Sequence, residues 1–417
     1  MIKGFGIKGP VLAAVSAIAL ATVVLAPPTV SGAQTPAITS PRIGTLYQGA
    51  VISGVWGISV FAQHADGSLT SVGQGYTEGL IPKSSAVIHL SSGKALYVLA
   101  GTASGPGYIF SFHIGSGGRL TPFASPVTAS LGPSANKLAA YDPLGTGAAG
   151  NPVLVTGACA TSLSDPTYCG AGLGTFAVDP ATGLLGPESI GIVQSSDPTQ
   201  LQSGPEMNAA GQLAFTAQIR PISGGWPYEL FFEKIKVISG VSTLVSLTGR
   251  IFSYSTSGKV TQIQLFGEPI VTSTHYVQID AGNLPGGVPG WLTIAFGSAS
   301  GAPVTVANGA SGGPNGYVNV ETQSRILASG TTTATGKCRF NQYGKSSPGL
   351  GAVYYVVPCG GSYPSITAAI DLHGFVYVGR YAQPTLVYRD LGTSGITRLS
   401  GTLIPAGTIQ AYSFSGF

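Results

Sequence analysis

Short runs of alternating apolar and polar residues follow one another along most of the chain, and most runs end at glycine, proline or serine. Residues 85–101 read "SAVIHLSSGKALYVLAG" and residues 108–125 read "YIFSFHIGSGGRLTPFAS". A period of two, rich in Val, Ile, Tyr and Phe, is typical of β-strands, and the Gly and Ser clusters between runs are typical of tight turns. These stretches predict four short strands joined by hairpins, at residues 85–90, 95–100, 108–114 and 119–125.

The third strand of this unit, with its glycine turn, recurs along the chain. Copies begin at Gly57, Gly107, Gly172, Gly249, Gly316 and Pro384, spaced 50 to 77 residues apart. A four-stranded unit cannot bury both of its faces alone, whereas units stacked radially about an axis bury one another. We expect an all-β fold, a closed β-propeller of six or seven four-stranded blades, with seven preferred. A pair of β-sandwiches is the alternative.

The two ends of the repeated region complement each other. Residues 42–51, 57–65 and 68–75 match the second, third and fourth strands of the unit, and no first strand precedes them. Residues 407–417, "GTIQAYSFSGF", form one extra strand pattern with no hairpin partner after it. Pairing of this strand with the first sheet would close the ring and remove its exposed edges. We therefore expect residues 42–417 to form a single propeller domain.

The first 33 residues have the pattern of a secretory signal peptide. Lys3 and Lys8 precede a fifteen-residue apolar run, Val11 to Leu25, and the small residues Ser31 to Ala33 offer a cleavage site. Residues 34–41 would then be a short linker, and the protein would be secreted or extracytoplasmic, in a periplasm or at a cell surface. The alternative is that this N-terminal segment is not cleaved and is retained as a membrane anchor.

Composition excludes several classes of partner. Charged residues make up only 8% of the chain, and the mean hydropathy is +0.33, which argues against disorder. The net charge of +4 is spread over single Lys and Arg residues, without the basic run that nucleic-acid binding leaves. We expect no nucleic-acid partner, no membrane contact beyond the signal peptide, and no cofactor, because no phosphate-loop or calcium-loop motif is present.

Four cysteines in an exported chain predict two disulfides. We favour pairing of the near neighbours, although the sequence alone allows three connectivities. Metal binding is disfavoured, because CxxC spacing is absent and no histidine accompanies the cysteines. The favoured pairs are Cys159 with Cys169 and Cys338 with Cys359.

The turns between strands resemble those of a known family. Residues 66–70 ("DGSLT"), 119–122 ("RLTP") and 179–184 ("DPATGL") are similar to turns of the lactonase-like and surface-layer seven-bladed propellers. The resemblance covers about half of the chain, mainly up to Arg220. It implies the propeller fold, and for a lactonase it implies His, Arg and carboxylate groups around the central channel.

Candidate catalytic residues gather in one place in the sequence. Asp371 precedes His373 by two positions, which would place both on one face of a strand, and Arg380 follows nearby. A carboxylate that orients a histidine would let it act as a base. The alternative is an ordinary turn aspartate beside a solvated histidine. His89, on another first strand, is a further channel candidate.

Two classes of function remain open. No strong acid–base constellation stands out, which favours a binding or structural module over an enzyme, with an extracellular protein or carbohydrate as its partner. The alternative is a lactonase-like hydrolase that acts on a sugar lactone or related ester at the channel. The pattern specifies neither the ligand nor the oligomeric state.

Overall fold

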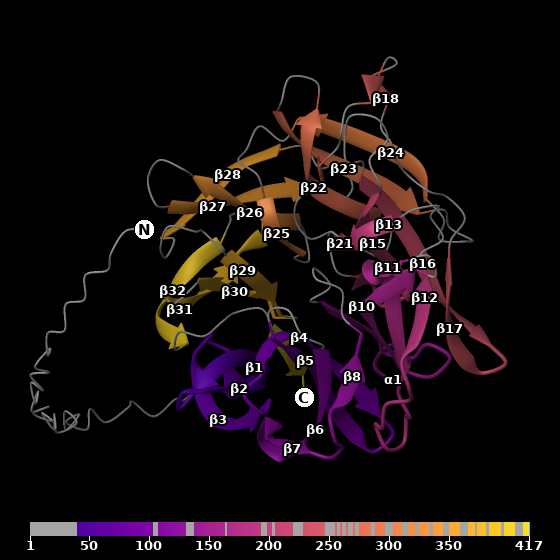
Figure 1. Ribbon diagram of the computed structural model, residues 1–417. Helices are drawn as coiled ribbons and strands as arrows, with labels where there is room; N and C mark the ends of the chain where they lie inside the picture. The colour runs from indigo at the N-terminus through magenta and orange to yellow at the C-terminus, as the bar shows by residue number, and fades with distance from the viewer. Residues whose placement is uncertain are drawn as a thin grey trace, which may run out of the picture. The chain divides into compact units, whose positions relative to one another are not determined.

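The computed structural model consists almost wholly of antiparallel β-strands (Figure 1). Among the described residues, a short α-helix, α1 (Pro143–Thr146), and a 3-10 turn, η1 (Ser116–Gly118), interrupt them. The structure describes residues 40–102, 107–130, 137–162, 165–192, 198–201, 205–219, 228–246, 255–256, 259–260, 264–265, 270–271, 275–284, 288–296, 303–310, 316–321, 325–332, 337–344, 350–358, 366–371, 373–380, 383–392, 396–404 and 412–416.

The strands of the first half of the chain are β1 (Arg42–Ile52), β2 (Val55–His64), β3 (Leu69–Tyr76), β4 (Ile81–Leu90), β5 (Gly93–Gly101), β6 (Gly107–Ile114), β7 (Leu120–Pro122), β8 (Val127–Ala129), β9 (Leu138–Tyr141), β10 (Val153–Ser162), β11 (Asp165–Ala177), β12 (Ser189–Ile192), β13 (Pro198–Leu201), β14 (Glu206–Met207), β15 (Gln212–Ile219), β16 (Tyr228–Ile238) and β17 (Val241–Ser246).

The strands of the second half are β18 (Ser255–Thr256), β19 (Lys259–Val260), β20 (Gln264–Leu265), β21 (Ile270–Val271), β22 (His275–Leu284), β23 (Val288–Phe296), β24 (Pro303–Ala310), β25 (Gly316–Glu321), β26 (Arg325–Thr332), β27 (Lys337–Gly344), β28 (Leu350–Pro358), β29 (Ile366–Ile370), β30 (Phe375–Arg380), β31 (Gln383–Asp390), β32 (Ile396–Ile404) and β33 (Tyr412–Gly416).

These strands form seven sheets of four or five strands and one two-stranded sheet within the described ranges. We number the larger sheets in chain order. They are the first (β3-β2-β1-β33), second (β4–β8), third (β9–β12), fourth (β13–β17), fifth (β20–β24), sixth (β25–β28) and seventh (β29–β32).

The predicted unit is confirmed in the second and seventh sheets. The four expected strands of the second sheet are β4 to β7, which pair in sequence order with hairpin registers. Near the C-terminus the same order recurs in β29 to β32. The all-β class and the four-stranded antiparallel sheets follow directly from the period-two pattern.

The C-terminal strand pairs where it was predicted to pair. Strand β33 lies antiparallel to β1, with Leu46 opposite Phe414 and Gln48 opposite Tyr412. It therefore adds the missing fourth strand to the first sheet and covers the edge of β1.

One copy of the repeated phrase does not occupy the expected position, and another lies mostly outside the described residues. The copy at Gly249 contributes β18 and β19, which pair only with each other in the described residues. The copy at Gly316 begins β25, an edge strand that opens the sixth sheet, and not the third strand of a unit. Sequence similarity between hairpins therefore identifies a strand pair without fixing its place in a sheet.

The burial of strand β5 explains why its hydrophobic run is nearly continuous. From Ala95 to Gly101 every residue is buried, because the strand has a packed sheet on both of its faces. Burial of a Leu or Val side chain stabilises the fold by about 1.5–3 kcal/mol. Its side chains alternate between the core shared with the first sheet, namely Leu96, Val98 and Ala100, and the core shared with the third, namely Ala95, Tyr97 and Leu99.

Each of the seven larger sheets contacts the next one in chain order. The contacting strands include β33 and β4, β4 and β9, β11 and β13, β14 and β21, β22 and β25, and β25 and β29. The seventh sheet also packs against the first (yellow and indigo in Figure 1). Their shared core contains Leu46, Phe61, Phe375, Tyr377 and Val387.

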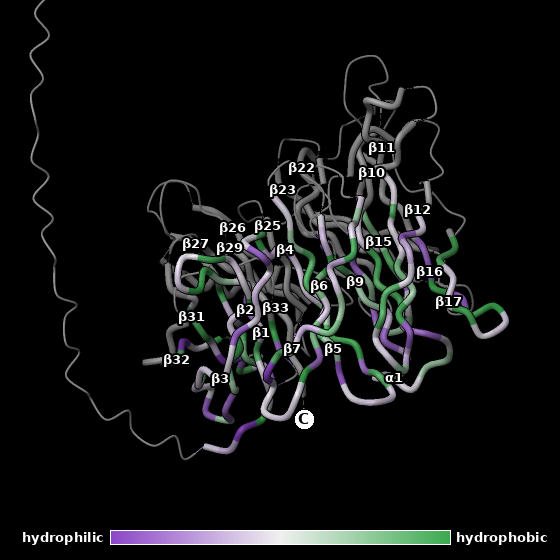
Figure 2. Tube along the Cα trace, turned by 60° about the horizontal axis from the view of Figure 1, so that its bottom comes forward, coloured by the Kyte–Doolittle hydropathy of each residue, from purple (hydrophilic) through white to green (hydrophobic). Residues whose placement is uncertain are grey.

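One pentapeptide, "VISGV", occurs twice and forms the same turn each time. Ser53 and Gly54 have φ values of 50° and 84°, and Ser239 and Gly240 have 51° and 82°. Two consecutive positive φ angles define the type I′ hairpin turn, which Gly favours at its second position. At the second copy the apolar hairpin tip is exposed, with Ile238 and Val241 each 55% accessible (Figure 2).

The proposed segments at the N-terminus lie mostly outside the described residues. Residues Ser40–Phe417 form one compact unit, separate from Met1–Thr39. The signal peptide (1–33), the linker (34–41) and the single propeller domain (42–417) therefore remain predictions. Among the described helices, none has the length and apolar character needed to cross a membrane.

Candidate functional site

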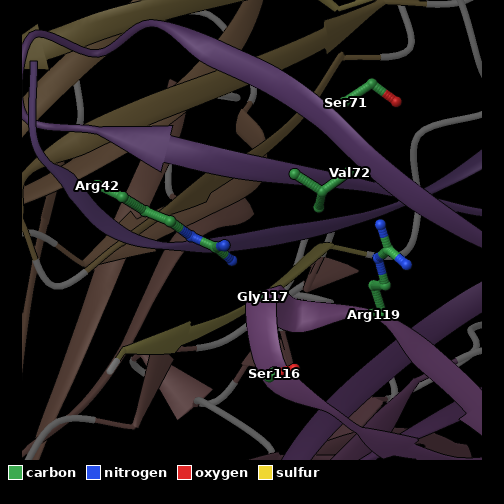
Figure 3. A pocket seen from close by; sticks show the side chains of 6 residues that line it. All are labelled: Arg42, Ser71, Val72, Ser116, Gly117 and Arg119. Carbon is green, nitrogen blue, oxygen red and sulfur yellow. The ribbon is translucent and has the colours of Figure 1, made fainter. Parts of the chain in front are cut away.

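A cationic cleft lies between the first and second sheets (Figure 3). Its volume is about 510 Å³. In the close-up, Arg42 and Arg119 approach the space from opposite sides. The cleft is lined by Arg42, Ser71, Val72, Ser116, Gly117 and Arg119.

Arg42 is held in place by its own strand. Its Nε donates to the carbonyl oxygen of Gly44 at 3.2 Å, and its Nη2 donates to the Thr45 hydroxyl at 2.6 Å. The η1 turn fits around this side chain because Gly118 has a φ of +75° and lacks a Cβ. A Cβ there would lie 2.6 Å from the Thr45 side chain and 3.0 Å from Nη2 of Arg42.

Arg119 follows the same turn from the other side. Its carbonyl oxygen accepts a hydrogen bond from the Gly115 N–H at 2.8 Å, which fixes the backbone of the turn. Its side chain is exposed, and no described residue pairs with its guanidinium. Among the described residues that line the cleft, two carry a guanidinium group and none carries a carboxylate.

A histidine–carboxylate pair lies at the edge between the second and third sheets. The Nδ1 of His89, near the end of β4, is 2.7 Å from Oδ2 of Asp142. Asp142 also caps α1, because its Oδ1 accepts the N–H of Gly145 at 3.0 Å. The same oxygen accepts the backbone N–H of His89 at 3.2 Å. The Asp142 carboxylate therefore holds the His89 ring at Nδ1, and 41% of the His89 side chain remains exposed.

This arrangement suits a general base. A carboxylate that accepts the Nδ1 proton fixes the tautomer of the imidazole and leaves Nε2 to take a proton from a reactant. Lys94 lies directly opposite His89 in the β4–β5 register, so the two side chains start from the same face of the sheet. The site thus combines a base, His89, with the carboxylate that orients it, Asp142, and a neighbouring cation, Lys94.

The predicted cluster at Asp371 is organised differently from the expectation. Oδ1 of Asp371 accepts the backbone N–H groups of His373 and Phe375, both at 2.8 Å. Oδ2 bonds the Gln63 amide and lies 3.5 Å from the Tyr377 hydroxyl. Burial raises the pKa of Asp371, and the two N–H groups oppose that rise. The carboxylate therefore holds the backbone of His373, and no bond to its ring is found among the described contacts.

The other two members of the cluster do not join this carboxylate. The His373 residue is exposed, and Arg380 ends β30 with its side chain outside the described set. The observed hydrogen bonds match the alternative interpretation of the sequence, in which Asp371 is an ordinary turn aspartate beside a solvated histidine. A catalytic role for His373, Asp371 and Arg380 remains a prediction.

The cysteines are only partly described. Cys159 on β10 and Cys169 on β11 lie on paired strands, where Cys159 is opposite Ala171 and Cys169 is opposite Thr161. Cys338 lies on β27, and Cys359 is outside the described residues. Both disulfides remain predictions. Among the described side chains, no group of three or more His, Cys, Asp or Glu residues could hold a metal ion.

Asp142, Asp66 and Asp179 each stand before Pro or Gly, a pattern typical of turns. All three bond local backbone N–H groups, but only the structure shows the partner of Asp142. The bond to His89 spans 53 residues, so no local pattern could reveal it. Arg42 and Arg119 come from separate sheets, and only the packing of those sheets brings them to one cleft.

Comparison with known proteins supports the fold. No family model and no curated protein matches the sequence. Solved structures match at low identity. A protein assigned as a 6-phosphogluconolactonase from Bacteroides fragilis aligns with a TM-score of 0.57 and 15% identity, covering 90% of this chain and 99% of that one.

Two further solved structures match over the same share of the chain. A protein assigned as a 6-phosphogluconolactonase from Bacteroides uniformis aligns with a TM-score of 0.57 and 11% identity. The periplasmic gluconolactonase of Pseudomonas aeruginosa aligns with a TM-score of 0.51 and 14% identity. Each match covers 90% of this chain and 99% of the other. The chain is thus similar in fold to lactonases, which bears out the lactonase-like side of the resemblance drawn from its turns.

Proposed function

We propose that this protein is an extracytoplasmic lactonase-type hydrolase that opens a sugar lactone or a related ester. The observation that carries the proposal is the likeness in fold, over 90% of the chain, to a gluconolactonase and to two proteins assigned as lactonases. The comparisons favour this alternative over the binding or structural module that the sequence favoured. The signal-peptide pattern and the periplasmic location of the Pseudomonas protein support a location outside the cytoplasm.

The proposed scaffold is a closed propeller of seven blades. Its support is the contact of each large sheet with the next in chain order, together with the core shared by the seventh and first sheets. The pairing of β33 with β1 would then link the end of the ring to its beginning. A closed ring gives a lactonase rigid strands from which to present its catalytic side chains.

We assign the base to His89 rather than to His373, because the described contacts include a carboxylate on the ring of His89 and none on the ring of His373. Nε2 of His89 takes a proton from water, and the resulting hydroxide attacks the carbonyl carbon of the lactone. The carbonyl oxygen becomes an oxyanion, which the ammonium group of Lys94 stabilises. When the oxyanion collapses, the ring C–O bond breaks, and the imidazolium returns its proton to the leaving alkoxide. The product is the hydroxy acid.

The test is hydrolysis of a panel of five- and six-membered sugar lactones and aryl esters by the purified chain, followed by acid release. We expect turnover above the uncatalysed rate. His89→Ala should lower kcat/KM by about 10²–10⁴-fold, the usual contribution of a general base. Asp142→Asn retains a capping oxygen for α1 and should lower kcat while leaving the melting temperature nearly unchanged.

His373→Ala is the matched control. We expect it to retain activity, because its ring is exposed and bonds no described carboxylate. Loss of activity in His373→Ala with full activity in His89→Ala would move the active site to the predicted cluster. Absence of turnover on every substrate by a folded wild-type chain would overturn the hydrolase proposal.

A further inference from the structure

We propose that Gly145 is a positioning residue of the His89 site, because a glycine at this position of α1 lets the Asp142 carboxylate reach the His89 ring. The inference deepens the proposed function and rests on it wherever turnover is measured. The contact between the two side chains can also be tested without any substrate.

The space beside Gly145 is filled by the paired side chains themselves. A Cβ on Gly145 would lie 2.5 Å from Nδ1 of His89 and closer still to Oδ2 of Asp142. These are the two atoms that form the 2.7 Å bond between the ring and the carboxylate. Since both atoms end movable side chains, a Cβ would displace the pair and leave the backbone in place. The ring would then lose the bond that sets its orientation and tautomer.

Gly145 also helps to aim the carboxylate. Its N–H donates to Oδ1 of Asp142 at 3.0 Å, and the backbone N–H of His89 donates to the same oxygen at 3.2 Å. With Oδ1 held by two backbone groups, Oδ2 is directed at the His89 ring. Gly145 therefore acts on the pair twice, through its N–H and through the room that it leaves.

The backbone of α1 does not itself require glycine at position 145. Gly145 lies within the helix and its φ is not positive, so an L-residue can adopt its conformation without strain. Inside a helix glycine is less favourable than alanine, because it loses more conformational freedom. The effect of glycine here is therefore on the side chains packed against it.

Gly147, two residues later, has the opposite requirement. It is the C-cap of α1, with a φ of +71°, and this left-handed conformation favours glycine. A Cβ at Gly147 would meet no described atom within 4 Å. Alanine at position 147 should therefore strain the backbone and spare the pair, whereas alanine at position 145 should disturb the pair and spare the backbone.

The experiment compares Gly145→Ala with Gly147→Ala by nitrogen NMR of histidine-labelled protein, by thermal unfolding and by lactone hydrolysis. In mildly alkaline solution, where the imidazole is neutral, His89 of the wild type should carry its proton on Nδ1. The His89 signal is identified by its loss in His89→Ala. Gly145→Ala should lower the fraction protonated on Nδ1 and should lower kcat by about tenfold or more, with the melting temperature unchanged or slightly higher.

Gly147→Ala is the matched control, and it should lower the melting temperature while keeping the tautomer and kcat of the wild type. A second comparison uses the Asp142→Asn background, in which Gly145→Ala should reduce kcat much less than it does in the wild type, because both changes act on one contact.

Three results would each overturn the positioning role: an unchanged His89 tautomer in Gly145→Ala, full turnover by that variant, or a fall in its melting temperature as large as that of Gly147→Ala. Fully additive losses in the Asp142→Asn background would also contradict it. A changed tautomer with no turnover by the wild-type chain would support the positioning role and overturn the hydrolase proposal, so the two failures are distinguishable.

Discussion

The interface between the first and seventh sheets differs from the interface between the second and third. At the former, buried side chains bond to one another: Gln63 donates to Asp371 and to Tyr377, and Gln48 donates to Thr385. At the latter, the core is apolar, and its buried polar side chains bond to backbone groups, as Tyr97 does to the carbonyl oxygen of Gly183 at 2.7 Å.

The difference between the two interfaces corresponds to how far apart in the sequence their sheets lie. The second and third sheets are consecutive, so a short connection already places them side by side. The bonds between the first and seventh sheets join residues 308 to 337 positions apart, and closing so long a loop costs conformational entropy. We interpret the buried polar bonds as a device that selects one alignment of the two sheets, since an offset would leave several buried groups without partners.

Breaking the apolar interface should give the largest loss. Phe176 is fully buried in the core between the second and third sheets, so Phe176→Ala leaves a cavity. We expect the free energy of unfolding to fall by about 4 kcal/mol, as for other buried Phe to Ala changes. Urea unfolding followed by tyrosine and tryptophan fluorescence measures it. A loss below about 1 kcal/mol would mean that the two sheets do not depend on this core.

Breaking the polar interface should cost somewhat less. Asp371→Ala removes the acceptor of two backbone N–H groups and of the Gln63 amide, all of them at a buried site. We expect a loss of about 3 kcal/mol, because each unsatisfied buried donor costs about 1–3 kcal/mol and the site can relax in part. Asp371→Asn keeps an oxygen for the two N–H groups and should lose less. Equal losses in the two variants would argue that the charge, and not the hydrogen bonds, matters here.

The smallest expected effect is a drift of stability with pH. Burial raises the pKa of Asp371 in the folded protein above its ordinary value of 3.8. A raised carboxyl pKa contributes stability that is complete below that ordinary value and is lost as pH rises through the folded pKa. The advantage of the wild type over Asp371→Asn should therefore shrink as the pH rises above about 4.

Asp66 supplies a control of opposite sign. The Ser68 hydroxyl and the Ser68 N–H lower the pKa of this exposed turn aspartate. Its contribution is present above the ordinary pKa and is lost as pH falls, so the difference between the wild type and Asp66→Asn should grow as pH rises. Parallel pH curves for the two variants would contradict the assignment of a raised pKa to Asp371.

Much of the fold could be predicted because local sequence patterns determine its strands and turns. The alternation in residues 85–125 specifies strands β4 to β7, and the glycine turns between them specify hairpins. The position of β33 could be predicted as well, since the first sheet lacked one strand. The copy at Gly316 was placed wrongly, because the sequence of a hairpin does not specify which strands will lie next to it.

Little of the candidate sites could be predicted, because they arise from packing between sheets. Asp371 and His373 are close in sequence, and proximity suggested a catalytic pair. Instead, the Asp371 carboxylate bonds the backbone that follows it, a common behaviour of aspartate at a turn. His89 and Asp142 are far apart in sequence and do pair, and neither the alternation nor the turn residues around them carry that information.

The pairing of β33 with β1 also has a consequence for the order of synthesis. Strand β1 is made before all the other described strands and β33 after them, so the first sheet cannot obtain its fourth strand while the intervening chain is still on the ribosome. Until then the hydrogen-bonding edge of β1 stays open to wrong partners. Completion of the first sheet therefore depends on the synthesis of every described strand between β1 and β33.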